Sequence, residues 1–412
     1  MTSVPSFSSK ENDVLFSWFI VCCGVVGAIN LAKIAPSMGR LIEHMNISLS
    51  TSGFIGAIFS TLTLSTGIIG GILIAKYGPR KAMLFGLLIS LVGNIIPIIR
   101  PNLSILMIGR ILEGYGFLLI NLAAPVLLNL HTQGNIRGRV MGIWGSFMPA
   151  GNAVIILIAP IIYLVSDWQL LWTFSAIYTA IILFFGGKII PNDPEHFKNQ
   201  IIGKTSFLIK QTIGRWSIII TGTTFACHSL IFLGTMQFLP YYFEIIAGYT
   251  ETISFLITVL FCLSSFVGHL FCGYLLQKGY SPEQLIGCAF LIAGCFVSFF
   301  FGVFDNFITS SELPWVKLAA IIAVAFFMGL TPPSIFYLIS FIAPPSRLTP
   351  INYGYMSQIQ ALGIFVGPFL FGWLVDVSGS WSAIGSTTIF ISICGCLCGI
   401  FSTKIILRKS IN

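Results

Sequence analysis

The sequence predicts an all-α integral membrane protein in which twelve transmembrane helices form two pseudo-symmetric six-helix bundles. Three observations lead to this fold class. Of the 412 residues, 56% are hydrophobic and only 8% are charged, whereas soluble domains carry about 25% charged residues. Apolar stretches long enough to cross a bilayer recur along the chain. The two halves of the chain also repeat each other weakly.

Twelve stretches reach the length of about 20 mostly apolar residues that a membrane-spanning helix needs. They lie near residues 14–38, 51–75, 82–99, 103–130, 140–165, 169–187, 215–243, 252–276, 284–303, 316–342, 352–375 and 383–403. The longest polar segment, 188–214, divides them six and six. We therefore expect an N-terminal six-helix bundle in 1–187, a cytoplasmic linker in 188–214 and a C-terminal six-helix bundle in 215–412.

Lys and Arg residues outside the spans concentrate on one side of the predicted membrane. If the N-terminus is cytoplasmic, sixteen of them lie in the cytoplasm, and only Arg40, Arg100 and Lys317 lie outside. Positive residues favour cytoplasmic loops, so both termini are expected there. The asymmetry accounts for most of the net charge of +8 without a nucleic-acid partner. Short loops favour a bacterial inner membrane.

The repeat is visible at corresponding points of the two halves. Gly71–Lys76 after the second span resembles Gly273–Lys278 after the eighth, and Pro125 in the fourth span corresponds to Pro332 in the tenth. Each pair is separated by about half the chain. Duplicated six-helix halves are typical of secondary transporters, whose substrate site lies near the membrane midplane between the halves.

The loop after the second span carries a basic pattern with regularly spaced glycines, Gly71-x-x-x-Ala75-Lys76-x-Gly78-Pro79-Arg80-Lys81. With Arg110-x-x-x-Gly114-x-Gly116 in the fourth span, it resembles the major facilitator superfamily over essentially the whole chain. This resemblance implies the major facilitator fold and a conformational motif at Gly71, Lys76, Gly78, Arg80 and Lys81. A basic turn that only sets topology would explain the charges but not the glycine spacing.

Two details qualify the resemblance. Ala75 stands where the family usually has Asp, an acid that helps to latch the outward-facing state, so the usual latch is incomplete here. The segment Phe238–Glu244 at the end of the seventh span is similar to a segment of the cyanate-permease branch, but this likeness is short.

Three charged residues lie well inside the spans: Lys33, Arg110 and Glu113. Because charge in the hydrocarbon core is costly, such residues usually face a cavity. We expect Lys33 and Arg110 to bind substrate and Glu113 to couple transport to protons. Alternatively, Lys33 extends to the outer interface, and Arg110 and Glu113, three residues apart, form an ion pair that serves packing.

Several neutral polar residues extend this predicted cavity. We expect Asn30, Asn121, Asn152, His228 and Gln358 to bind substrate. His228 and His269 are equally compatible with hydrogen-bonded core positions. Gln358 and Gln360 face different ways on a helix, so at most one of them is expected to line the cavity.

The sequence thus favours a secondary active transporter that moves a small solute by alternating access. Proton coupling and an anionic or zwitterionic organic solute are favoured. The alternatives are a proton-driven exporter of drugs or a siderophore-like metabolite, and a non-transporting sensor. No nucleotide-binding or hydrolase motif occurs, so an enzyme is not expected. The expected partners are the solute, protons and the lipid bilayer, without nucleic acid, metal or cofactor, and the protein is expected to be a monomer.

Overall fold

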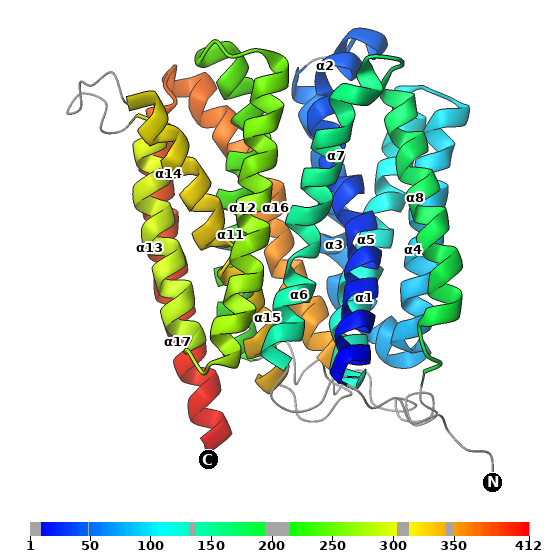
Figure 1. Ribbon diagram of the computed structural model, residues 1–412, viewed down its shortest axis with the longest axis vertical. Coiled ribbons are helices and arrows are strands. Elements are labelled where there is room, and N and C mark those ends of the chain that lie inside the picture. Colours follow the sequence, from blue (N-terminus) through cyan, green and yellow to red (C-terminus); the bar gives the residue numbers. More distant parts are fainter. Residues whose placement is uncertain are drawn as a thin grey trace.

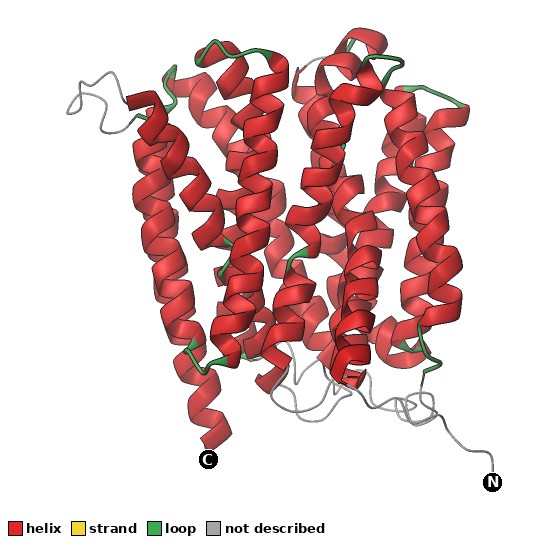
Figure 2. Cartoon of the chain, in the orientation of Figure 1, coloured by secondary structure: helices red, strands yellow, loops and turns green. Residues whose placement is uncertain are grey.

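The computed structural model describes residues 10–47, 49–131, 137–193, 215–302, 313–342 and 349–411. Within these ranges the regular structure is helical, with no strand (Figure 2). Twelve segments are long and apolar enough to cross a membrane. Each of their ends lies within three residues of its predicted position. The predicted all-α membrane fold is therefore confirmed.

The helices fall into two consecutive sets. The first set comprises α1 (Lys10–Ala32), α2 (Ile34–Met45), α3 (Leu49–Tyr77), α4 (Pro79–Ile99), α5 (Leu103–His131), α6 (Arg137–Gly145), α7 (Phe147–Tyr163) and α8 (Trp168–Ile189). The second set comprises α11 (Trp216–Tyr241), the π-helix η2 (Tyr242–Ile246), α12 (Glu251–Gln277), α13 (Pro282–Phe300), α14 (Leu313–Met328), α15 (Thr331–Ile342), α16 (Thr349–Ser378) and α17 (Ser382–Ile411). Most of the predicted linker, residues 194–214, lies outside the described residues.

Three of the twelve spans are broken into two helices, and each break lies three residues before a proline. Span one breaks at Lys33 before Pro36, and span five breaks at Ser146 before Pro149. Span ten breaks after Met328, and Pro332 follows. A proline has no N–H to donate to the preceding turn, and its ring clashes with the carbonyl there. These breaks interrupt the backbone hydrogen bonding of three spans inside their apolar segments.

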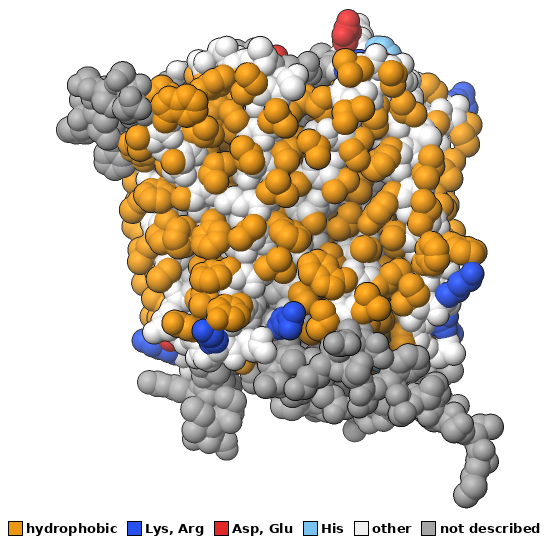
Figure 3. Space-filling model, in the orientation of Figure 1, with side chains coloured by type: hydrophobic (Ala, Val, Ile, Leu, Met, Phe, Trp, Pro, Cys, Tyr) orange, Lys and Arg blue, Asp and Glu red, His pale blue; other side chains and the backbone are white. Residues whose placement is uncertain are grey.

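The two sets form bundles that stand side by side, with α3 and α16 at their junction (Figure 1). On a second line of contact, α6 and α7 pack against α12. A belt of hydrophobic side chains covers the visible face, and most visible Lys and Arg atoms gather near the end where α1 begins and α17 ends (Figure 3). We call this end the lower end, as the figure draws it.

Glycines let the two bundles touch through their backbones near the lower end. A Cβ atom on Gly71 of α3 would lie 2.8 Å from the Cα atom of Ile351 in α16. One on Gly142 of α6 would lie 2.7 Å from the Cα atom of Gly273 in α12. Real Cβ atoms do not approach this closely, so the bundles meet at a distance that only glycine permits. The molecule is closed along these two seams.

Candidate functional site

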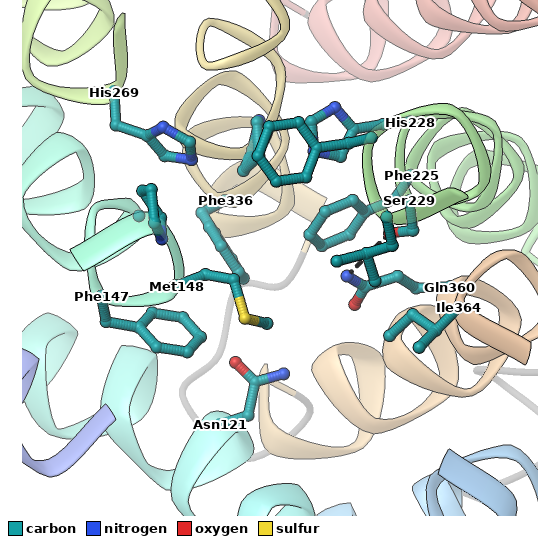
Figure 4. Close-up of a pocket in the computed structure, with 15 residues that line it drawn as sticks. Asn121, Phe147, Met148, Phe225, His228, Ser229, His269, Phe336, Gln360 and Ile364 are labelled. Carbon is teal, nitrogen blue, oxygen red and sulfur yellow. Dashed lines mark hydrogen bonds between the residues drawn. The ribbon is translucent and has the colours of Figure 1, made fainter. Parts of the chain in front are cut away.

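A pocket lies between the two bundles at the level of the broken spans five and ten (Figure 4). The first bundle contributes residues of α5, α6 and α7, and the second contributes residues of α11, α12, α15 and α16. The lining residues are Asn121, Gly145, Phe147, Met148, Pro149, Phe225, His228, Ser229, Phe232, Leu233, His269, Pro332, Phe336, Gln360 and Ile364. The prolines that break spans five and ten thus stand in its wall.

Neutral polar groups converge on this pocket from four helices, α5, α11, α12 and α16. Asn121 Oδ1 and His228 Nδ1 are buried and have no hydrogen-bond partner within the described part of the chain. Gln360 Nε2 donates to Ser229 Oγ at 3.2 Å. Burying an unpaired polar atom costs about 1–3 kcal/mol. The free atoms of Asn121 and His228 are therefore available to a ligand that can form hydrogen bonds with them.

Aromatic rings form much of the remaining wall. Phe225 and Phe336 meet edge to face, with 5.7 Å between their centroids. The His228 ring stacks on Phe232 at 5.7 Å. Behind Phe147, the Trp144 ring stacks at 4.3 Å. These contacts fix the side-chain rotamers that shape the pocket.

The pocket is small and uncharged in this conformation. Its volume is about 40 Å³, which is room for a few water molecules, whereas ligand pockets usually measure about 300–1,000 Å³. None of its lining residues is Lys, Arg, Asp or Glu. An organic solute can occupy it only after the bundles have moved apart.

The three intramembrane charges lie inside the first bundle, away from the pocket lining. Glu113 Oε1 is 2.7 Å from Lys33 Nζ, and Glu113 Oε2 is 2.5 Å from Arg110 Nη1. All three side chains are 0% exposed. Both carboxylate oxygens therefore have a cationic partner, and we call these three residues the ion network.

Neighbouring helices complete the hydrogen bonds of Lys33. Its ammonium also donates to Asn94 Oδ1 at 2.5 Å and to Asn30 Oδ1 at 3.2 Å. It lies 4.4 Å from the centroid of the Trp172 ring. With Glu113, the three N–H groups of an ammonium thus have three acceptors, which is the coordination of a protonated lysine.

The break in span one helps to balance the excess positive charge of the ion network. Arg110 Nη1 donates to the backbone oxygen of Asn30 in the last turn of α1, and Arg110 Nε donates to Ile55 O at 3.4 Å. A helix C-terminus carries about half a negative elementary charge, so α1 ends where it stabilises a cation. The Phe59 ring, 4.6 Å from Arg110 Cζ, adds a cation–π contact.

The predicted substrate-binding residues divide among three environments. Asn121 and His228 line the pocket, whereas Asn30, Lys33 and Arg110 join Glu113 in or beside the ion network. Asn152 and Gln358 each reach across to the other bundle. Asn152 Nδ2 donates to Met236 Sδ at 3.2 Å, and Gln358 Oε1 accepts from the backbone N–H of Ile68 at 3.2 Å.

The conformational motif surrounds the turn between α3 and α4. Gly78 has φ +94°, and a side chain there would collide with Asp193, which follows α8. Asp193 Oδ1 accepts from the backbone N–H of Arg80 at 2.9 Å, and Arg80 Nη2 donates to Gly187 O at 2.8 Å. Asp193 thereby places a carboxylate at the N-terminus of α4, although Ala75 is not acidic.

Lys76 and Lys81 of the same motif are exposed at the lower end. Lys76 Nζ lies 5.1 Å from the Tyr77 ring centroid. Their positions suit contact with lipid head groups rather than with the pocket. Gly71 lies at the seam with α16, as described above.

Sequence reasoning missed three participants and chose Gln358 where the pocket has Gln360. The three are Ser229, which lines the pocket, Asn94, which binds Lys33, and Asp193, which holds the turn before α4. Asn94 and Ser229 are polar residues inside apolar spans, and this was the one feature of the sequence that could have identified them. The direction of a side chain within a buried helix has no signature in one sequence.

Comparisons with known proteins agree with this architecture. A sequence profile described as Major Facilitator Superfamily matches residues 20–368. An uncharacterized transporter of Rickettsia bellii is 22% identical over 290 residues, which is 68% of this chain and 70% of that protein. A facilitated trehalose transporter Tret1-2 homolog of Drosophila sechellia is 26% identical over 206 residues. That match covers 48% of this chain and only 41% of the trehalose transporter.

A solved structure shows the same fold along the whole chain. It is the proton:xylose symporter XylE, a major facilitator superfamily protein bound to 6-bromo-6-deoxy-D-glucose. The TM-score is 0.79 at 17% sequence identity, with 97% of each chain covered. The likeness extends the agreement from the sequence profile to the arrangement of all twelve spans.

Proposed function

The chain belongs to the Major Facilitator Superfamily and is a secondary transporter rather than an enzyme, and we propose that it moves a small, neutral, polyhydroxylated solute together with protons. The observation that carries the substrate class is the pocket between the bundles. Its polar groups are amides, imidazoles and a hydroxyl, its apolar walls are phenylalanine rings, and none of its lining residues is Lys, Arg, Asp or Glu.

This lining suits hydroxyl groups for two reasons. A hydroxyl both donates and accepts, so it can pair with Asn121 Oδ1 as well as with the amide of Gln360. The C–H faces of a sugar-like ring pack on aromatic side chains such as Phe147 and Phe336. Two similar proteins, a facilitated trehalose transporter homolog and a proton:xylose symporter, support the same class.

The anionic or zwitterionic solute predicted from the sequence depends on Lys33 and Arg110. In this conformation both cations are fully buried and contact Glu113, and neither lines the pocket. A solute carboxylate would have to compete with Glu113 inside the first bundle. The geometry therefore favours the neutral solute, and the anion prediction becomes an outcome to be tested.

A ligand screen tests the substrate class directly. The unfolding temperature of the purified protein is measured against monosaccharides, disaccharides, polyols, organic acids, amino acids and lipophilic amines. We expect stabilisation by sugars or polyols alone. Stabilisation by organic anions would support the anion prediction, and stabilisation by lipophilic cations would support drug export. Either result would overturn the neutral class.

Reconstituted flux then tests transport and coupling. In proteoliposomes, an imposed pH gradient should accelerate uptake of the stabilising solute, and collapse of the gradient by an ionophore should remove the acceleration. Gln360→Leu should weaken solute binding, whereas Gln358→Leu, two residues away on α16 and outside the pocket, serves as the matched control. Solute binding without flux would indicate a sensor instead.

We also propose that a monomer lies in a bacterial inner membrane with both termini in the cytoplasm, and that the two bundles and the linker have the predicted boundaries. Lys and Arg atoms near the lower end support this orientation (Figure 3). Reporter tags at residues 200 and 410 should be cytoplasmic, and tags at 45 and 308 should be external. Opposite sidedness of either pair would reverse the topology.

A further inference from the structure

The hydrogen bond of His269 defines which ring nitrogen faces a ligand. His269 Nδ1 lies 2.7 Å from the backbone oxygen of Ser265, one turn earlier on α12. A carbonyl oxygen only accepts, so Nδ1 must carry a hydrogen. In the neutral ring, Nε2 therefore has a lone pair. His269 lines the pocket and points toward its interior (Figure 4), so this nitrogen is the basic atom that it presents.

The same residue lies on the seam between the bundles. A Cβ atom on Gly145, at the end of α6, would be 3.0 Å from His269 Cδ2 and 3.0 Å from Pro333 Cγ on α15. One turn earlier, a Cβ atom on Gly142 would be 3.1 Å from the backbone oxygen of His269. The ring is thus enclosed by the ends of two broken spans, one from each bundle.

We propose that His269 is the group through which a proton controls the opening of the pocket. A second proton on its ring would place a full positive charge in a pocket whose lining contains no carboxylate. Such a charge is costly where water is excluded. Separation of the bundles admits water and lowers that cost. The open states therefore bind the proton more strongly than the closed state does, and acidification favours opening.

The other titratable groups near His269 do not supply a counter-ion. His228 of α11 also lines the pocket, and its Nδ1 has no partner among the described residues. Cys272 lies one turn along α12, and Tyr337 of α15 packs against the cluster that contains Cys272. Arg139, in the first turn of α6, is exposed. Among the described residues, a positive His269 would thus have no anionic neighbour, and a protonated His228 or Arg139 could only repel it.

This proposal rests on the proposed function for the identity of the pocket, but its test needs no solute. Pairs of spectroscopic labels on the two bundles report their separation in lipid nanodiscs between about pH 8 and pH 5, the range in which histidines commonly titrate. Genetically encoded labels at exposed Lys81 and Lys404 avoid the exposed thiols of Cys288 and Cys295. Outward-facing opening is followed by a second pair at exposed Val165 and Trp315.

We expect the population of closed molecules to fall at least threefold across this range in the wild type. In His269→Gln, whose amide keeps a donor but gains no charge, the population should stay constant. His228→Gln and His44→Gln should retain the response, since the His228 ring packs against Phe225 and Phe232 of its own helix rather than against the first bundle, and His44 is outside the pocket. A response that persists in His269→Gln, or that disappears only in His228→Gln, would overturn the proposal.

A measurement on the unmodified chain covers the case in which His269→Gln does not fold. Nitrogen-15 NMR of labelled histidine should show His269 with hydrogen on Nδ1 and a bare Nε2 at pH 7.5. Hydrogen on Nε2 alone would overturn the proposal. Failure of the ligand screen would leave both tests interpretable, because neither depends on the solute. Conversely, if sugars or polyols bind but the population of closed molecules does not change with pH, the proposed role of His269 is wrong and the neutral substrate class stands.

Discussion

The first bundle and the seam between the bundles bury polar groups in opposite ways. In the first bundle, Lys33, Arg110 and Glu113 are fully buried charges, joined to one another and to three further helices, α3, α4 and α8. At the seam, the pocket lining is neutral, and two of its polar atoms have no partner in the described structure. Arg110 Nη2 also lacks a hydrogen-bond partner among the described residues, but both carboxylate oxygens of Glu113 are paired with cations. The contrast suggests that paired charges hold helices together in the first bundle, whereas the unpaired neutral groups of the pocket are available to a ligand.

The charge balance of the ion network gives the largest expected effect. Glu113→Gln leaves Lys33 and Arg110 as buried cations without a counter-ion, which should destabilise the fold by about 3–5 kcal/mol. Lys33→Met leaves the Arg110–Glu113 pair balanced and should cost clearly less. Thermal unfolding in detergent measures both. Glu244→Gln, at an exposed position in η2, is the control. Equal damage from Glu113→Gln and Lys33→Met would mean that net charge does not govern this region.

At the seam, the closed state should be sensitive to the size of a side chain rather than to its charge. Gly142→Ala would force a methyl group against the backbone of Gly273 and should weaken the closed state by about 1–3 kcal/mol. Gly187→Ala on α8 is the matched control, because nothing lies within 4 Å of the new Cβ atom. Distance measurements between the bundles should show opening only in Gly142→Ala. An unchanged distance distribution would mean that this contact does not hold the bundles closed.

Two substitutions near the turn before α4 should differ in effect: one changes the stability of α4, and the other changes the balance between the closed and open states. Asp193→Ala removes the acceptor of the Arg80 N–H and should cost about 1 kcal/mol, as loss of a helix cap does. Ala75 lies one turn beyond Gly71 and is fully buried in the closed state, so Ala75→Asp would place a carboxylate near the N-terminus of α16. That variant should favour the closed state, in which the helix N-terminus stabilises the charge. If the distances between the two bundles do not change in Ala75→Asp, an acid at position 75 does not stabilise the closed state.

The smallest effect is expected at the upper end, where a surface contact, an ion pair only when His44 is protonated, joins α2 to the residue before α8. His44 Nε2 lies 2.7 Å from Asp167 Oδ2, and the two side chains are 50% and 22% exposed. Such pairs contribute about 0.2–1 kcal/mol, and salt screens them. His44→Gln should therefore lower the unfolding temperature only slightly, and less at high salt. A loss as large as that of Glu113→Gln would contradict the distinction between buried and exposed charge.

The spans were predictable because hydropathy and length are properties of consecutive residues. Asn121 and His228 were also found, since polar side chains inside spans are costly and tend to serve a purpose. The contact between Lys33 and Glu113 joins residues 80 positions apart. It depends on how three-dimensional packing orients their helices, so one sequence gave no signal for it.

Gln360 and the helix breaks show two further limits. Gln358 and Gln360 lie about 200° apart around α16, so the orientation of this helix decides which of them lines the pocket, and Gln360 does. A proline follows every break, yet Pro125 and Pro368 lie inside unbroken helices. A helix break therefore costs less free energy near a proline, and the packing of neighbouring helices decides whether the break occurs.

Solute affinity in two variants tests most directly whether the pocket, and not the ion network, binds substrate. The solute identified by the ligand screen is titrated at fixed pH against Gln360→Leu and Lys33→Met, each compared with the wild type. We expect Gln360→Leu to lose at least about tenfold in affinity, equivalent to about 1.4 kcal/mol, and Lys33→Met to stay within about twofold. An undiminished affinity in Gln360→Leu, together with a tenfold loss in Lys33→Met, would place the substrate at the ion network and contradict the neutral pocket.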